Sequence, residues 1–263
     1  MTDVVSIDWL ADRLDAVRVV DVRDAWEYDG IGHLPGAVNV PFDTFRSEAG
    51  QEGMLPPAAD WAALLGAAGI DPDDEIVAYD DTHGVFAARF LVTAELLGHD
   101  PDRLHLLDGD YSAWTREREV SREAPAVAET TYEVREPAST PLVGFEAVEA
   151  AVDTDAVIVD TREREEYETG HIPGAVLLDW RELVDDETRG LKPRAELTRI
   201  LEDRGIAPDE RVLLYCNTAR RISHTYVVLR HLGYEDLAFY EGSLTQWKER
   251  GGELETGAPE ESR

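Results

Sequence analysis

The sequence VLLYCNTARRISHTYVVLRHLGY (residues 212–234) contains the single cysteine of a chain of 263 residues. Its first four residues form a short apolar run typical of a buried strand, and from about Ile222 onward the apolar residues recur with helical spacing. Cys216 therefore falls directly after a strand and directly before a helix. In open parallel sheets, ligands bind at this edge, outside the carboxyl ends of the strands. The segment predicts an α/β fold with a cysteine at its binding edge.

The surroundings of Cys216 decide between two interpretations of a lone cysteine. A free cysteine is often a small buried hydrophobe. Here the expected turn directs backbone N–H groups toward its own centre, and the following helix adds the positive end of its dipole. Arg220 and Arg221 add two positive charges within the same turn. Because these features favour a thiolate over a thiol, we interpret Cys216 as a nucleophile.

The chain contains related sequence blocks twice, in the same order. GHLPGA, EIVAYDDTHGVFAARFLVTAELLGH and LLDGDYSAW begin at residues 32, 75 and 106. GHIPGA, RVLLYCNTARRISHTYVVLRHLGYE and FYEGSLTQW begin at residues 170, 211 and 239. The offsets therefore drift slowly from 138 to 136 to 133 residues. This pattern indicates a duplicated domain rather than a solenoid of short repeats.

Each copy alternates short apolar runs with stretches of helical period, which predicts parallel strands covered on both faces by helices. The predicted strands are 18–22, 76–79 and 104–107 in the first copy, and 156–160, 212–215 and 237–240 in the second. The predicted helices are 58–68, 85–97, 194–204 and 222–232. Between the copies the composition is that of a linker. We expect domains at 1–120 and 141–263, joined by a linker at 121–140.

The charge of the chain is strongly negative. Its 25 basic and 56 acidic residues give a net charge of −31, and only Lys192 and Lys248 among the basic residues are lysines. Because concentrated salt screens the resulting repulsion, this composition predicts a halophilic protein. A surface of this charge repels phosphate backbones, so we expect no nucleic-acid partner.

Several other classes conflict with the sequence. No apolar run approaches the roughly 20 residues of a membrane span, and the N-terminus MTDVVSIDWLADRLD has no secretory signal. We therefore expect a cytoplasmic protein without a membrane partner. The seven histidines and one cysteine show no metal-ligand spacing. We expect neither a metal nor another cofactor.

Three motifs together resemble the rhodanese family: a D-x-R strand end at 160–162, the GHIPGA turn and the cysteine-centred loop. The resemblance covers nearly the whole chain, in the tandem form in which only the second copy is catalytic. It implies two tandem rhodanese-like domains, each a parallel sheet flanked by helices. Asp80 follows Tyr79 where Cys216 follows Tyr215. Because a carboxylate cannot carry a sulfane sulfur, the first domain is expected to be catalytically inactive.

The resemblance implies a sulfurtransferase that moves the sulfane sulfur of thiosulfate to cyanide or a cellular thiol through a persulfide on Cys216. The substrate-binding residues that it implies are Arg162, Asn217, Thr218, Ala219, Arg220 and Arg221. Two alternatives within this chemistry stay open: 3-mercaptopyruvate as the donor, or a carrier that passes persulfide sulfur to a partner protein. A cysteine phosphatase fits poorly, because its loop needs a Cys-x5-Arg spacing and this loop has Cys-x4-Arg.

Overall fold

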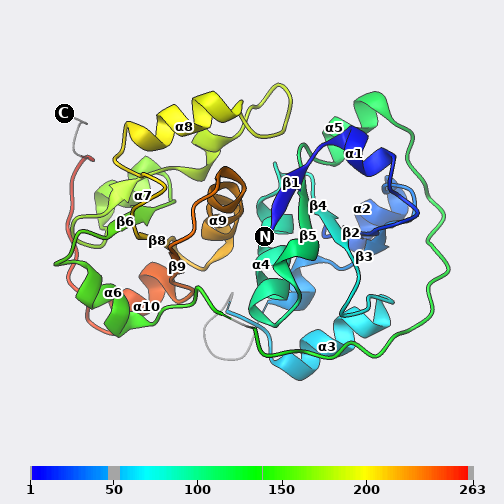
Figure 1. Cartoon of the computed structure of the whole chain (residues 1–263), viewed down its shortest axis with the longest axis horizontal. Helices are drawn as coiled ribbons and strands as arrows, with labels where there is room; N and C mark the ends of the chain where they lie inside the picture. The colour runs from blue at the N-terminus through cyan, green and yellow to red at the C-terminus, as the bar shows by residue number, and fades with distance from the viewer. Residues whose placement is uncertain (1, 47–53, 138, 260–263) are drawn as a thin grey trace. The chain divides into compact units, whose positions relative to one another are not determined.

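The computed structural model describes residues 2–46, 54–137 and 139–259 of the chain. Residues 1 and 47–53 of the predicted first domain, residue 138 of the predicted linker and residues 260–263 of the predicted second domain thus lie outside the described part. Figure 1 shows parallel strands with helices packed around them in both halves of the chain. The prediction of an α/β fold in each copy is confirmed.

The chain divides into two compact units. Unit 1 comprises Met1–Thr140 together with Asp185–Leu191, and unit 2 comprises Pro141–Val184 together with Lys192–Arg263. A short segment from the second half of the sequence therefore belongs to the first unit. The described part of 121–140 contains neither helix nor strand, yet it is bonded to unit 1, where the Thr130 N–H donates to the Gly66 carbonyl over 3.0 Å.

The sheet of unit 1 has five parallel strands in the order β1-β5-β4-β2-β3. The strands are β1 (Asp3–Val5), β2 (Arg18–Asp21), β3 (Val38–Asn39), β4 (Ile76–Tyr79) and β5 (Leu104–Leu107). The α-helices are α1 (Ile7–Ala11), α2 (Ala25–Gly30), α3 (Ala58–Ala67), α4 (Val85–Leu96) and α5 (Tyr111–Glu117), with 3-10 helices η1 (Phe42–Phe45) and η2 (Pro101–Arg103). Every residue of β4 and β5 is buried, because helices cover both faces of the sheet.

The sheet of unit 2 has four parallel strands in the order β7-β6-β8-β9. The strands are β6 (Val157–Asp160), β7 (Val176–Leu177), β8 (Val212–Tyr215) and β9 (Leu237–Phe239). The helices are α6 (Phe145–Ala151), α7 (Arg164–Thr169), η3 (Trp180–Leu183), α8 (Arg194–Glu202), α9 (Arg220–Leu232) and α10 (Ser243–Glu249). The central strand β8 is wholly buried and pairs with β6 and β9.

The core of unit 2 fixes β8 and hence the loop that follows it. Leu213 and Tyr215 point to one face of the sheet, where they join Phe145 of α6, Tyr167 of α7 and Trp247 of α10. The 3-10 helix η3 packs against α9, the helix that follows β8. The ring of Trp180 in η3 contacts the ring of His224 in α9 edge-on, with 5.3 Å between the ring centroids. The carboxyl end of β8 is therefore held from both sides of the sheet.

Candidate active site

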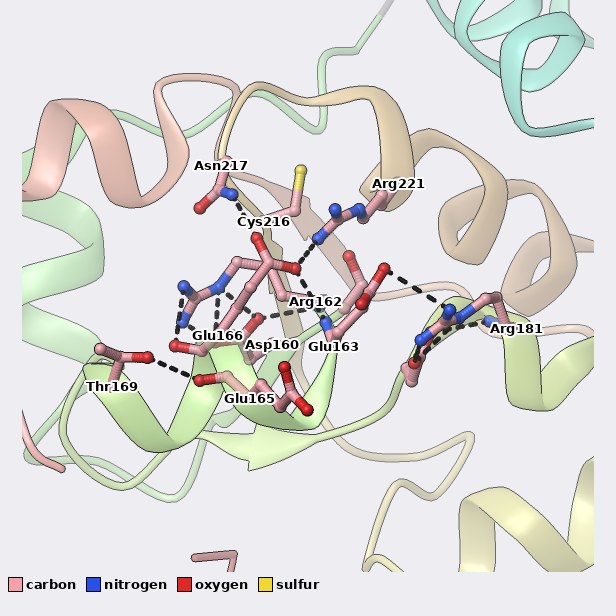
Figure 2. Close-up of polar contacts among 12 residues, drawn as sticks. Asp160, Arg162, Glu163, Glu165, Glu166, Thr169, Arg181, Cys216, Asn217 and Arg221 are labelled. Carbon is pink, nitrogen blue, oxygen red and sulfur yellow. Dashed lines mark hydrogen bonds and ion pairs between the residues drawn. The ribbon is translucent and has the colours of Figure 1, made fainter. Parts of the chain in front are cut away.

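Cys216 is the first residue after β8, and α9 begins four residues later at Arg220. The helix thus starts two residues earlier than its predicted start at Ile222, which places Arg220 and Arg221 in its first turn. Cys216 is only 2% exposed. Figure 2 shows its sulfur between the Asn217 side chain of the same loop and the Arg221 side chain at the start of the helix. The structure therefore gathers a thiol and an arginine at the carboxyl edge of the central strand.

The backbone of the loop is held in an unusual conformation at Ala219. This residue has a φ of 66°, in the left-handed region that glycine adopts most easily. Its counterpart in unit 1, His83, has a φ of 54°. The left-handed residue is therefore a feature of the loop in both copies and is not confined to the copy with the cysteine. The remaining predicted loop residue, Thr218, is half-buried between Asn217 and Ala219.

Glu166 of α7 joins the two ends of this loop. Its Oε1 accepts a hydrogen bond from the Asn217 side-chain amide at 2.7 Å, and its Oε2 forms an ion pair with Arg221. Burial raises the pKa of the Glu166 carboxyl, but the bonds from Arg221, the Glu163 N–H and Asn217 outweigh burial and leave that pKa below its usual value. The sequence-based list of site residues did not include Glu166. A sequence signal for Glu166 was available, because it follows the D-x-R motif at the end of the strand next to β8.

Ser243 lies against the other side of Cys216. Its hydroxyl accepts the Cys216 N–H at 3.1 Å, donates to the Tyr240 carbonyl at 2.9 Å, and lies 4.0 Å from the Cys216 sulfur. Ser243 has a φ of 49° and is fully buried. Ser243 lies in the repeated block FYEGSLTQW, but it is not among the predicted site residues. The hydroxyl is one of the polar groups nearest the thiol.

Arg162 is buried, with 3% of its surface exposed. Its guanidinium donates to both carboxylate oxygens of Asp160, at 3.0 and 2.6 Å, and to the Gly170 carbonyl at 2.8 Å. Arg23 of unit 1 makes the same bonds to Asp21 and the Gly32 carbonyl. The predicted role of Arg162 in binding substrate stays a prediction, and the arrangement common to both copies ties the D-x-R strand end to the GHIPGA turn.

The equivalent loop in unit 1 surrounds a carboxylate. Both oxygens of Asp80 accept backbone N–H groups: Oδ1 from Thr82 at 2.7 Å and Gly84 at 2.8 Å, and Oδ2 from Phe86 at 2.7 Å and Ala87 at 3.0 Å. Burial raises the pKa of the Asp80 carboxyl, and these four bonds oppose the rise. This loop is therefore a cradle of N–H groups that encloses one anionic group of its own chain.

A second group of charges lies beside that cradle. Arg189, from the segment Asp185–Leu191 of unit 1, forms an ion pair with Asp110 at 2.6 Å and donates to the Asp81 carbonyl at 3.0 Å. Asp81 and Asp110 stand at the positions of Asn217 and Ser243 in the other copy. The first-copy loop thus has carboxylates at three positions where the second copy has a thiol, an amide and a hydroxyl.

Within the described residues, no group of three or more His, Cys, Asp and Glu side chains has the arrangement of a metal site. Over the same residues, the helices are too short or too polar to span a membrane.

Comparison with known proteins identifies the architecture. The model of the rhodanese-like domain matches twice, at residues 6–117 and 145–250. A thiosulfate sulfurtransferase of Pseudomonas aeruginosa is 35% identical, covering 90% of this chain and 91% of the relative. A putative thiosulfate sulfurtransferase of Haloferax volcanii is 32% identical, covering 93% and 92%. The chain is also similar to the crystal structure of SseA from Escherichia coli, with a TM-score of 0.79 at 26% identity. SseA is described as a 3-mercaptopyruvate sulfotransferase with the rhodanese fold. That match covers 92% of this chain and 99% of SseA.

Proposed function

Because the chain belongs to the rhodanese-like family, with one such domain in each half, we propose that it is a thiosulfate sulfurtransferase. It moves the sulfane sulfur of thiosulfate to a thiophilic acceptor, cyanide or a cellular thiol. The relatives of P. aeruginosa and H. volcanii carry that name or its putative form. The observation that carries the proposal is the placement of Cys216 directly after the carboxyl end of β8, with Arg221 in the first turn of α9.

The reaction proceeds in two displacement steps. The Cys216 thiolate attacks the outer sulfur of thiosulfate, a new S–S bond forms, and sulfite leaves with the electron pair of the broken bond. The enzyme then carries a persulfide. The acceptor attacks the terminal sulfur of that persulfide, and the electron pair of the S–S bond returns to Cys216 as a thiolate.

The cradle of unit 1 supports a persulfide intermediate in unit 2. At the offset of 136 residues, the N–H groups that bind the Asp80 carboxylate correspond to those of Thr218, Arg220, Ile222 and Ser223. A persulfide on Cys216 extends one atom beyond the thiol and carries negative charge. The Ser223 N–H donates to the Ala219 carbonyl at 3.3 Å, so we propose that the N–H groups of Thr218, Arg220 and Ile222 stabilise this charge, as their counterparts do at Asp80.

The donor is bound through arginines and the loop. Arg220 and Arg221 attract the dianion, and the guanidinium of Arg221 suits the sulfonate oxygens as a forked donor. Asn217, Thr218 and Ala219 shape the loop around the sulfur. We propose that Arg162 also binds the donor at this edge of the sheet, while it keeps Asp160 as its ion-pair partner.

We propose that the domain at 1–120 is catalytically inactive and that the domain at 141–263 is catalytic, with 121–140 as the linker. The support is chemical: Asp80 has no sulfur, and its carboxylate occupies the cradle that a sulfur anion would need. We further propose a halophilic protein, on the grounds of its net charge of −31. A cytoplasmic location stays a prediction.

A second donor, 3-mercaptopyruvate, is favoured by one observation: the similarity in structure to SseA over nearly the whole of both chains. The same persulfide would then pass to a thiol or to a partner protein. The two donors leave different products, sulfite and pyruvate.

Measuring both products from the purified protein in molar salt tests the proposal. We expect sulfite release from thiosulfate with cyanide as acceptor, and a mass increase of one sulfur atom on Cys216 after thiosulfate treatment without acceptor. Pyruvate release at a higher kcat/KM than sulfite release would replace thiosulfate by 3-mercaptopyruvate. Release of neither product would refute the proposed function.

A further inference from the structure

Glu166 contacts the catalytic loop at both ends. It is the third residue of α7 and is 30% exposed at its side chain, so that it reaches Asn217, directly after the cysteine, and Arg221, five residues after it. Figure 2 shows both contacts as dashed lines from one carboxylate. A single anionic group thus spans the segment whose backbone surrounds the sulfur.

The helix cap alone does not account for these contacts. Glu166 completes a capping box, in which its Oε2 accepts the Glu163 N–H at 3.2 Å. Glu27 stands at the same place in unit 1, four residues after Arg23, and caps α2 through the Asp24 N–H at 3.2 Å. The positions of unit 1 that correspond to Asn217 and Arg221 are Asp81 and Val85, whose side chains donate no hydrogen bond. The two copies share the cap, whereas the clamp on the loop belongs to the copy with the cysteine.

We propose that Glu166 is the positioning residue of the sulfur-transfer site: it orients Arg221 and Asn217 around Cys216 and offsets part of the positive charge of the loop. The proposal rests on the proposed function, because it assigns Arg221 to a sulfur oxyanion. Through these two contacts Glu166 acts on the donor without contacting the transferred sulfur.

The charged groups that face this carboxylate come from three elements. Arg221 is on α9, Arg181 is on η3, and Arg162 precedes α7. Glu163 adds a second carboxylate, which lies 3.5 Å from Arg181. Of these arginines, Arg162 is paired with Asp160 and Arg181 with Asp179, each at 2.6 Å. Removing the Glu166 charge therefore leaves chiefly Arg221 without its carboxylate partner. Arg221 is the arginine nearest the cysteine in sequence after Arg220.

The variant Glu166→Gln separates positioning from capping. Glutamine completes a capping box as glutamate does, so α7 keeps its start. The glutamine oxygen that keeps the cap also faces Arg221 but carries no charge, and the amide N–H group then faces Asn217, which donated to the lost carboxylate oxygen. We expect kcat/KM for thiosulfate to fall by about 10- to 100-fold, the loss typical of a displaced binding group. We also expect the rate of Cys216 alkylation by iodoacetamide, plotted against pH, to shift to lower pH, because the unpaired Arg221 favours the thiolate.

Two matched variants serve as controls. Glu165→Gln removes the same charge from the neighbouring, exposed position of α7, and Glu27→Gln alters the equivalent cap in unit 1. Both should keep the wild-type kcat/KM and alkylation profile. Thermal melts of all three variants at the same salt concentration show whether the fold is retained.

Opposite changes in the two measurements, slower transfer with alkylation at lower pH, support the positioning role. Slower transfer with an unchanged alkylation profile would make Glu166 a structural cap and overturn the proposal, as would wild-type behaviour in both. The alkylation profile uses no sulfur donor. A wild-type protein that releases no sulfite would therefore refute the proposed function while leaving the test of Glu166 intact.

Discussion

The cradle around Asp80 makes the folded state of unit 1 depend on a buried anion. The substitution Asp80→Ala removes both carboxylate oxygens and leaves four backbone N–H groups without their acceptor. Two of these bonds, from Gly84 and Ala87, are buried, whereas those from Thr82 and Phe86 are partly buried. Water reaches the second pair more easily than the first.

These differences set the size of the effect. A buried donor without a partner costs about 1–3 kcal/mol, so Gly84 and Ala87 together account for about 2–6 kcal/mol. A bond whose donor rehydrates costs about 0.5–1.5 kcal/mol. Relief of the buried charge and entry of water offset part of this sum, and we expect a net loss of roughly 3–6 kcal/mol in the free energy of unfolding. For a chain of this size that lowers the Tm by roughly 10 °C or more.

Thermal and urea unfolding in molar potassium chloride measure this loss, with Asp29→Ala as the control for an exposed aspartate of unit 1. Sulfate or thiosulfate, added at constant ionic strength, should partly restore the Tm of the alanine variant by filling the vacated cradle, and should leave the control unchanged. An alanine variant as stable as the wild type would refute the reasoning, because the four N–H groups would then need no anion.

Four further outcomes follow from the site. Cys216→Ser should abolish sulfur transfer with a change in Tm of only a few degrees, and turnover by the serine variant would contradict the persulfide mechanism. Arg221→Lys should reduce kcat/KM for thiosulfate by roughly 10-fold or more, since a lysine cannot act as a forked donor; equal activity would remove the arginine from donor binding. Asp80→Cys should gain no measurable transfer, because the first-copy loop carries no arginine and Arg189 beside it is already paired with Asp110; detectable persulfide at residue 80 would show otherwise. The Tm should rise steeply from dilute to molar potassium chloride, as screening weakens the repulsion of a net charge of −31; a Tm independent of salt would exclude a halophilic protein.

The regular elements were predictable where the sequence pattern is local and long enough. β4, β5 and β8 lie at the predicted residues, because four consecutive buried residues leave an unbroken apolar run. The two-residue strands β3 and β7 carry no such run, and they exist only because β2 and β6 bond to them. Their register is a property of the sheet and is absent from their own sequence.

The polar contacts of the site depend on residues far apart in the sequence. Cys216 and its loop were predictable, since strand, loop and helix follow one another directly. Glu166 lies about 50 residues earlier and reaches the loop only because β6 and β8 are neighbours in the sheet. Arg189 belongs to unit 1 although its sequence neighbours before and after the segment belong to unit 2. No motif in the segment of Arg189 encodes its partners, and the D-x-R motif before Glu166 marks the strand end without naming the loop residues that Glu166 contacts.

The two loops show how one backbone serves two anions. In unit 1 the anion is the Asp80 carboxylate, which is covalently part of the chain and cannot leave. In unit 2 the side chain at that place ends in a single sulfur, which under the proposed function gains and loses a second sulfur atom during turnover. The flanking positions change accordingly: Asp110 holds Arg189 in unit 1, whereas the neutral Ser243 lies 4.0 Å from the sulfur in unit 2. A thiolate needs neutral or positive neighbours. The two copies therefore differ at three positions around a shared backbone, and in unit 1 the Asp80 carboxylate accepts four N–H groups of that backbone.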